Sequence, residues 1–152
     1  MCQNKLLTLD FSKEEALTKV LPQLPILTSK EAGWHGIYLA YDRYQLPGKT
    51  PEFAAQQYGI SIFEQVPQPI RAHRKLDGRS RYEQVVQGDV VIVPANTSHQ
   101  VQWDTPGSVL MLGFEPTIFN YAIYEMVDPE KVALAQAGAC PPSHPTLLHL
   151  IR

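Results

Sequence analysis

The stretch GDVVIVPANTSHQVQW, residues 88–103, reads as two apolar strands joined by a turn, and it carries one histidine, His99. Valine and isoleucine favour strands, whereas the letters PANTS between them favour a turn. His99 could be a metal ligand, a contact to a bound molecule, or a packed ring that is hydrogen-bonded at a hairpin end. The choice depends on which residues the fold brings to it.

Short strand-like segments separated by turns also occur on both sides of this stretch. From Gly33 to Phe114 the chain alternates apolar and polar residues in short segments, which are separated by turn signals such as LPGKTP, LDG and DTPG. Asp77-Gly78 is the sharpest predicted turn, because a two-residue hairpin loop needs positive φ angles. Antiparallel strands at this spacing indicate a sandwich, a jelly roll or a small barrel. The predicted strands are Trp34–Arg43, Tyr58–Val66, Ile70–Lys75, Arg79–Val86, Asp89–Val93, His99–Trp103 and Val109–Phe114.

A helix is predicted before the β region. Ser12 to Glu15 spells S-x-x-E, a capping box. The helix would carry Leu17, Val20 and Leu21 on one face, and Pro22 would end it.

Helices are also predicted after the β region. Beyond Phe114 the apolar period changes from two to about 3.6 residues, and Pro116 fits the first position of a helix. Further helices are predicted from Asp128 to Ala137 and from Thr146 to Arg152. The apolar stripe of the first of them consists of Ile118, Phe119, Ala122, Ile123 and Met126.

Size and composition limit the kind of protein. The 152 residues, 44% of them apolar, are enough for one ordinary domain, and a net charge of −2 gives no footprint for nucleic acid. No run approaches the roughly 20 apolar residues of a membrane span, and the start lacks the marks of a secretory signal. Cys2 and Cys140 are read as free thiols. We therefore expect a soluble, cytoplasmic protein with no membrane partner.

Within residues 88–103, the spacing G-x5-P-x-N-x2-H resembles the second conserved motif of the cupin superfamily. Metal-binding cupins combine this histidine with an HxH pair and a glutamate from the preceding motif. The strand in the corresponding place, 58–62, contains no histidine, and Glu83 lies too close to Gly88 for the family spacing. Because a metal site needs three or four converging donors, we expect neither a metal ion nor a cofactor.

A longer resemblance covers most of the chain. The succession GWHGIYLAYDRYQLPGKTPE, LDGRSRYEQVVQGDVVIVPANTSHQVQW and GFEPTIF resembles the N-terminal effector domain of AraC-type transcriptional regulators. The resemblance implies a metal-free, cupin-like double-stranded β-helix, or jelly-roll barrel, over residues 1–114. It also implies a helical dimerisation segment over residues 115–152 of the same domain. A small-molecule effector and a homodimer are then expected, with DNA bound only through a C-terminal domain that this chain lacks.

Candidate ligand-binding residues come from two arguments. Strand parity puts His99 and Trp103 on one face, and Tyr58 and Ile60 share a face of the strand that replaces the HxH strand. The family resemblance implies that His99, Trp103, Val109 and Met111 point into the barrel. The resemblance also assigns the helical stripe of residues 118–126 to dimerisation.

Other functions remain open at this point. A stand-alone, metal-independent cupin enzyme such as an isomerase or epimerase could use His99 as a base, with Tyr58 as a possible acid. A purely structural dimer module would have a barrel filled by its own side chains. The basic residues near Asp77-Gly78 could bind an anion, although an exposed hairpin that faces solvent is the preferred interpretation for Arg71, His73, Arg74, Lys75, Arg79 and Arg81.

Overall fold

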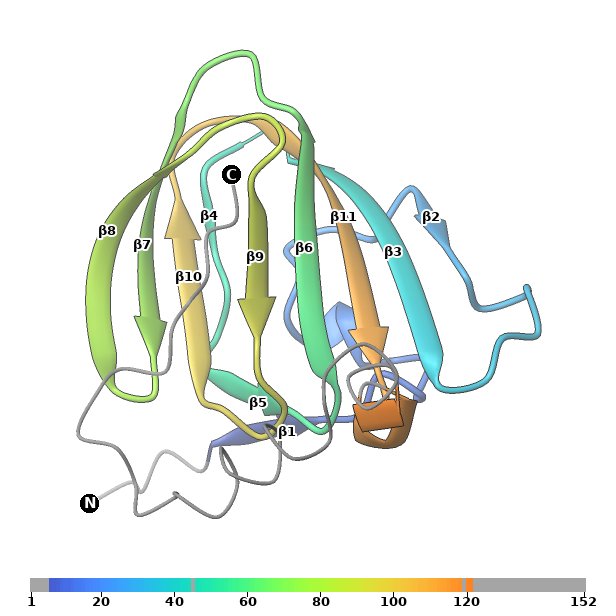
Figure 1. Cartoon of the computed structure of the whole chain (residues 1–152). Helices are drawn as coiled ribbons and strands as arrows, with labels where there is room; N and C mark the ends of the chain where they lie inside the picture. Colours follow the sequence, from blue (N-terminus) through green and yellow to red (C-terminus); the bar gives the residue numbers. More distant parts are fainter. Residues whose placement is uncertain (1–5, 45, 119, 122–152) are drawn as a thin grey trace.

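Two β-sheets face each other across the interior of the protein (Figure 1). The structure, a computed structural model, describes residues 6–44, 46–118 and 120–121. The first sheet has the order β1 (Leu7–Leu9), β5 (Phe53–Ala55), β10 (His99–Trp103), β7 (Ile70–Leu76) and β8 (Arg79–Val85), with β4 (Gly48–Lys49) also on β10. The second has the order β2 (Leu27–Thr28), β3 (Ile37–Tyr44), β11 (Gly107–Phe114), β6 (Tyr58–Gln65) and β9 (Val90–Val93).

This arrangement confirms the predicted mainly β, two-sheet fold class. The seven long strands of the sequence analysis correspond to β3 and β6 to β11, with ends displaced by at most three residues. Four further strands, β1, β2, β4 and β5, were not predicted; they have only two or three residues each. Such segments are too short for an alternating pattern to stand out.

The predicted Asp77-Gly78 turn and the predicted turn within PANTS are both present. Asp77 and Gly78 have φ angles of 46° and 74°, as the hairpin between β7 and β8 requires. Asn96 has a φ of 58°, so it fills the left-handed position between β9 and β10. The stretch that joins these two strands therefore folds as its letters predicted.

The predicted N-terminal helix is wrong. The segment forms turns and one short 3₁₀ helix, η1 (Leu17–Lys19). Its backbone bonds include those from Lys19 to Ala16 and from Val20 to Leu17, both with 3₁₀ spacing. Few residues separate the start of the segment from Pro22, so a full α-helix has no room to propagate. The segment is held by burial of Ala16 and Val20 instead.

The C-terminal helical prediction can be followed only at its start. Residues 116–118 and 120–121 are helical, immediately after β11. Ile118 packs over Gly36, where a Cβ atom would overlap its side chain. The other predicted residues of the apolar stripe lie outside the described residues: Phe119, Ala122, Ile123 and Met126. The two later predicted helices also lie outside them. Among the helices of the described part, none is long and apolar enough to cross a membrane.

An apolar cluster closes one end of the space between the sheets. Ile70, Val85 and Trp103 are buried there. The Trp103 ring lies 4.6 Å from the Tyr44 ring, and its Nε1 donates a hydrogen bond to the carbonyl of Leu46.

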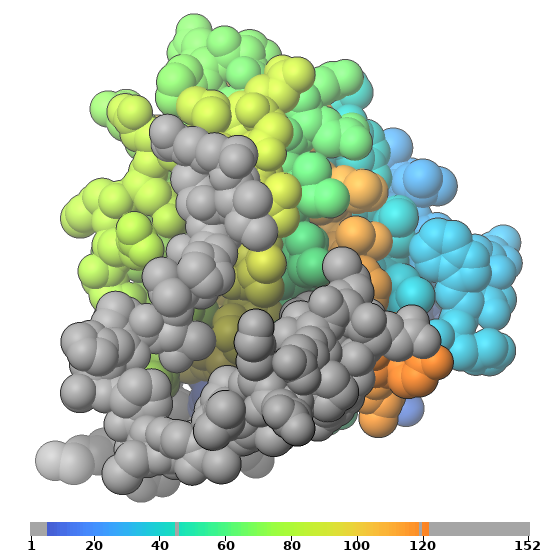
Figure 2. Space-filling model, viewed as in Figure 1, coloured from blue at the N-terminus to red at the C-terminus, as the bar shows by residue number. Residues whose placement is uncertain are grey.

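At one edge of the body, next to β3, the segment between β2 and β3 projects outward (Figure 2).

Candidate ligand-binding site

A cavity of about 700 Å³ lies between the two sheets. Its walls come from both sheets and from the N-terminal segment, and most of the lining side chains are apolar or aromatic. Such a volume is within the range of small-molecule sites, about 300 to 1,000 Å³. The barrel is therefore not filled by its own side chains.

Five of the six predicted ligand-binding residues line this cavity. His99 and Trp103 contribute from β10, Val109 and Met111 from β11, and Ile60 from β6. The fold thus brings together residues that lie up to 51 positions apart in the sequence, from Ile60 to Met111.

The inward face of β6 differs from the predicted one. Ser61 lies opposite Met111 and Phe63 opposite Val109, so the cavity-facing positions of β6 are the odd-numbered ones. Tyr58 is not among the described residues that line the cavity, whereas Ile60 contributes to the lining although it alternates with Ser61 along the strand. The alternation misled here, because the predicted face, with Ile60 and Ile62, is more apolar than the odd-numbered face, with Gly59, Ser61 and Phe63.

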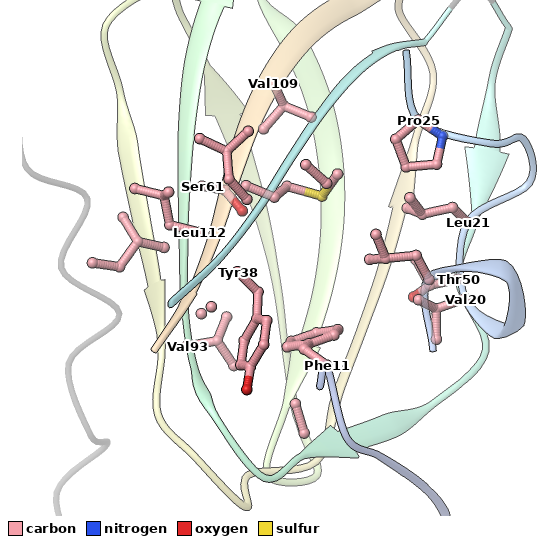
Figure 3. Close-up of a pocket in the computed structure, with 18 of the residues that line it drawn as sticks. Phe11, Val20, Leu21, Pro25, Tyr38, Thr50, Ser61, Val93, Val109 and Leu112 are labelled. Atoms are coloured by element: carbon pink, nitrogen blue, oxygen red, sulfur yellow. The ribbon is translucent and has the colours of Figure 1, made fainter. Parts of the chain in front are cut away.

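The N-terminal segment forms a wall that the sequence did not reveal. Phe11, Val20, Leu21 and Pro25 line the cavity, and Figure 3 shows the Phe11 ring beside Tyr38. A Cβ atom on Gly113 would lie 3.1 Å from the Phe11 ring, so the glycine leaves room for this ring. The signal for this wall was the apolar spacing of the segment, which the sequence analysis attributed to a helix.

His99 is the central polar group of the cavity. It is 8% exposed, and its Nε2 lies 2.8 Å from Nη1 of Arg74. Because a guanidinium can only donate, Nε2 accepts this hydrogen bond and the hydrogen-bond network assigns the ring proton to Nδ1. The Phe53 ring lies edge-on to the imidazole at 5.6 Å between centroids. His99 is therefore a packed, oriented ring that also lines the cavity.

Burial keeps the His99 ring neutral. Burial, with a smaller contribution from the positive charge of Arg74, lowers the pKa of the imidazole to about 3. A neutral imidazole with an occupied Nε2 is a hydrogen-bonding group with a fixed orientation. It has little capacity to take up a proton near neutral pH.

Arg74 is a functional candidate that the sequence analysis placed incorrectly. Its side chain is 5% exposed and forms an ion pair with Glu83, with 2.6 Å between Nε and Oε1. Arg71, Arg79 and Arg81 are exposed, as predicted for the hairpin. On β7, strand parity separates Arg71 from Arg74, which lies on the cavity face with Ile70 and Ala72. Arg79 and Arg81 pair with Leu76 and Arg74 and share this face, but they lie on β8 at the edge of the sheet.

Gln57 anchors the base of the cavity. The buried side chain accepts a hydrogen bond from the backbone N–H of Phe11 and donates to Asp10 and Glu115. The hydroxyl of Tyr38 donates to the same Glu115 oxygen, and burial followed by this hydrogen bond raises the pKa of Tyr38. One polar network thus ties the N-terminal wall to the residue that precedes the helical turn.

The described residues contain no group of three or more histidine, cysteine, aspartate or glutamate side chains that could hold a metal ion. His99 has a guanidinium, rather than a carboxylate or another imidazole, as its polar neighbour. A cationic neighbour opposes metal binding at that ring.

No family model matches the chain, and no curated protein matches it. Among solved structures, an ethanolamine utilization protein from Salmonella typhimurium aligns at 12% identity and a TM-score of 0.44, over 60% of this chain and 66% of its own. A cupin 2 conserved barrel domain protein from Salinispora arenicola aligns at 20% identity and a TM-score of 0.43, over 57% of this chain and 70% of its own. A cupin superfamily protein from Desulfitobacterium hafniense aligns at 18% identity and a TM-score of 0.46, over 63% of this chain and 95% of its own. The chain thus spans just under two thirds of the first of these proteins, and the likenesses concern the fold alone.

Proposed function

We propose that this chain is a non-catalytic, small-molecule-sensing domain of the AraC type. The single observation that carries the proposal is the cavity of about 700 Å³ between the sheets, with apolar walls and a few polar groups at fixed positions. Ile60, His99, Trp103, Val109 and Met111 would contact the effector. Tyr58 would act only indirectly, because it lies outside the cavity lining.

Binding fits this site better than catalysis. The alternative is a stand-alone, metal-independent cupin enzyme that uses His99 as a general base. A base works best when its pKa lies near the working pH, and the buried imidazole of His99 has a pKa of about 3. Its Nε2 is also occupied by Arg74. These two features favour a role in orienting a ligand over a role in proton transfer.

The regulatory part of the proposal concerns the tail. The apolar stripe Ile118, Phe119, Ala122, Ile123 and Met126 would mediate a homodimer in the cytoplasm. DNA would be bound by a C-terminal domain of a longer chain. A ligand would shift this assembly only by the difference in its affinity for two arrangements of the domain.

A metabolite library followed by thermal unfolding tests the proposal. A true ligand should raise the unfolding midpoint, because only binders of the native state stabilise it by mass action. Ser61→Leu, which adds a side chain inside the cavity, should abolish the shift, whereas Ser80→Leu on the exposed face of β8 should preserve it. A hit that survives Ser61→Leu unchanged, or a library without hits, contradicts the proposal. Turnover of a hit into product would favour the enzyme instead.

A further inference from the structure

We propose that the ligand of this cavity is a neutral, largely apolar molecule with a hydrogen-bond acceptor, such as a carbonyl oxygen, at the end that reaches His99 and Arg74. This inference rests on the proposed function, because it specifies the ligand of the same cavity. The donors beside His99, the charge of the buried ion pair and the chemistry of the walls support it.

The polar groups beside His99 are donors. Nε2 of His99 is occupied by Arg74, so the ring offers Nδ1–H. Among the described residues, none provides an acceptor for Nδ1 of His99. This nitrogen is also not fully buried. The atom is therefore accessible, and the ring that carries it lines the cavity. A ligand can satisfy this donor only by presenting an acceptor.

The charge of the site favours a neutral acceptor. Arg74 is the one charged residue of the described cavity lining that is buried, since Lys13, Glu14 and Lys30 are exposed. Its charge is already balanced by Glu83, whose side chain is 10% exposed and which does not contribute to the described lining. The ion pair thus turns its positive end toward the cavity while carrying no net charge.

This arrangement discriminates among three kinds of ligand. A carbonyl oxygen has its partial negative charge stabilised by the positive end of the ion pair. A carboxylate would enter as an unpaired charge, and its loss of hydration would exceed what a neutral ion pair returns. An ammonium group would face Arg74 and find only donors. A neutral carbonyl, ester or amide therefore fits best.

The rest of the cavity fits an apolar ligand body. Aromatic rings of Phe53 and Phe63 line it together with Val109 and Met111. The Phe53 ring also packs edge-on against His99, which places an apolar wall directly beside the donor. A flat ring system with one acceptor matches both features.

Three compounds of nearly equal shape test the inference: 2-acetylnaphthalene, 2-isopropylnaphthalene and 2-naphthoate. Binding to the full chain is measured at pH 7 by calorimetry and by NMR of protein labelled with ¹⁵N-histidine. We expect the ketone to bind about tenfold more tightly than either other compound, since an unmet buried donor costs roughly that factor. We also expect it to move the Nδ1 resonance of His99. Equal or tighter binding of the hydrocarbon or the carboxylate would overturn the inference and leave the proposed function standing.

Two variants isolate the donor. His99→Phe keeps an aromatic ring and removes Nδ1–H, so the ketone should lose its advantage over the hydrocarbon. His73→Phe is the matched control, because His73 stacks on Tyr82 outside the cavity lining, and it should keep that advantage. If His99→Phe does not fold, the Nδ1 resonance of the unaltered protein decides. Binding of none of the three compounds overturns the ligand class, whereas the proposed function falls only if the metabolite library also fails.

Discussion

The side-chain amide of Gln57 donates a 2.8 Å hydrogen bond to Oε1 of Glu115. Glu115 directly follows β11 and precedes the helical turn that begins at Pro116. The same Gln57 side chain holds the backbone N–H of Phe11, which lines the cavity. One buried residue therefore connects the cavity wall to the start of the tail.

Loss of this connection should destabilise the protein. Gln57→Leu keeps the volume but leaves the Phe11 N–H without its acceptor, and it leaves Glu115 with only the hydrogen bond from Tyr38. We expect the free energy of unfolding in urea to fall by about 2 kcal/mol, as is typical when buried polar groups lose a hydrogen bond. The matched control is Gln56→Leu, whose side chain is exposed in the preceding position. Equal stability of the two variants would contradict the role assigned to Gln57.

The long strands were predictable because each has enough residues for period-two alternation or an apolar run, as in β9 to β10 with its Asn96 turn. Residues placed by this pattern, His99, Trp103, Val109 and Met111, do meet in the cavity. The inward face of β6 was not predictable, because its more apolar face, with Ile60 and Ile62, is not the face that carries Ser61 and Phe63. The alternation of a strand predicts its inward face only where the apolar residues lie on that face.

The polar part of the site was also missed, for a different reason. Arg74 lies in a run of basic residues, and only the pairing of β7 with β8 and β10 shows that it faces inward, toward Glu83 and His99. Similarly, the network of Gln57 joins residues 46 and 58 positions away from it. Partners this distant in sequence leave no local signal.

The ion pair between Arg74 and Glu83 gives a second prediction. Arg74→Met should reduce the free energy of unfolding by about 3 to 5 kcal/mol, because it leaves a buried carboxylate unpaired. The double variant Arg74→Met with Glu83→Gln should recover much of this loss. The control is Arg71→Met, which breaks the exposed pair with Asp104 and should change stability little. Urea denaturation of the four proteins checks this, and equal effects of the two single variants would refute burial as the cause.

The pH dependence of stability gives a third prediction. Because burial lowers the pKa of His99 to about 3 from 6.5, the unfolded state binds a proton at a pH where the folded state does not. Stability should therefore fall as the pH drops below 6.5, by roughly 1 kcal/mol per pH unit. Denaturation between pH 6.5 and 5 measures this slope.

This pH window separates His99 from the carboxyl groups. Hydrogen bonds from Ser12 and Ser98 lower the pKa of Asp10 and of Glu52, respectively, so both contribute only at lower pH. His99→Phe has no proton to gain in the unfolded state at this position. In this variant the free energy of unfolding should therefore depend less on pH, by the contribution predicted for His99. An unchanged pH dependence would mean that another group causes it.

A close approach between Gly48 and Trp103 gives the last prediction. A Cβ atom on Gly48 would overlap Cζ2 of the Trp103 ring and lie 2.9 Å from its Cε2. The ring cannot yield easily, because it packs on Tyr44 and its Nε1 is bonded to the carbonyl of Leu46. We therefore expect Gly48→Ala to reduce the free energy of unfolding by about 1 to 3 kcal/mol, as overpacking does.

The displaced ring should also be visible in ligand binding and fluorescence, since Trp103 lines the cavity. The other tryptophan, Trp34, is 52% exposed, so the blue-shifted part of the emission belongs to Trp103 and should move to longer wavelength in Gly48→Ala. Gly59→Ala is the matched control, because its Cβ would meet Val93 at an ordinary 3.8 Å. It should keep the emission; because Gly59 itself lines the cavity, ligand affinity is not compared with this control. If Gly48→Ala behaved like this control, Trp103 would not be fixed by contact with Gly48, and the shape of that end of the cavity would depend on Tyr44 and Leu46 alone.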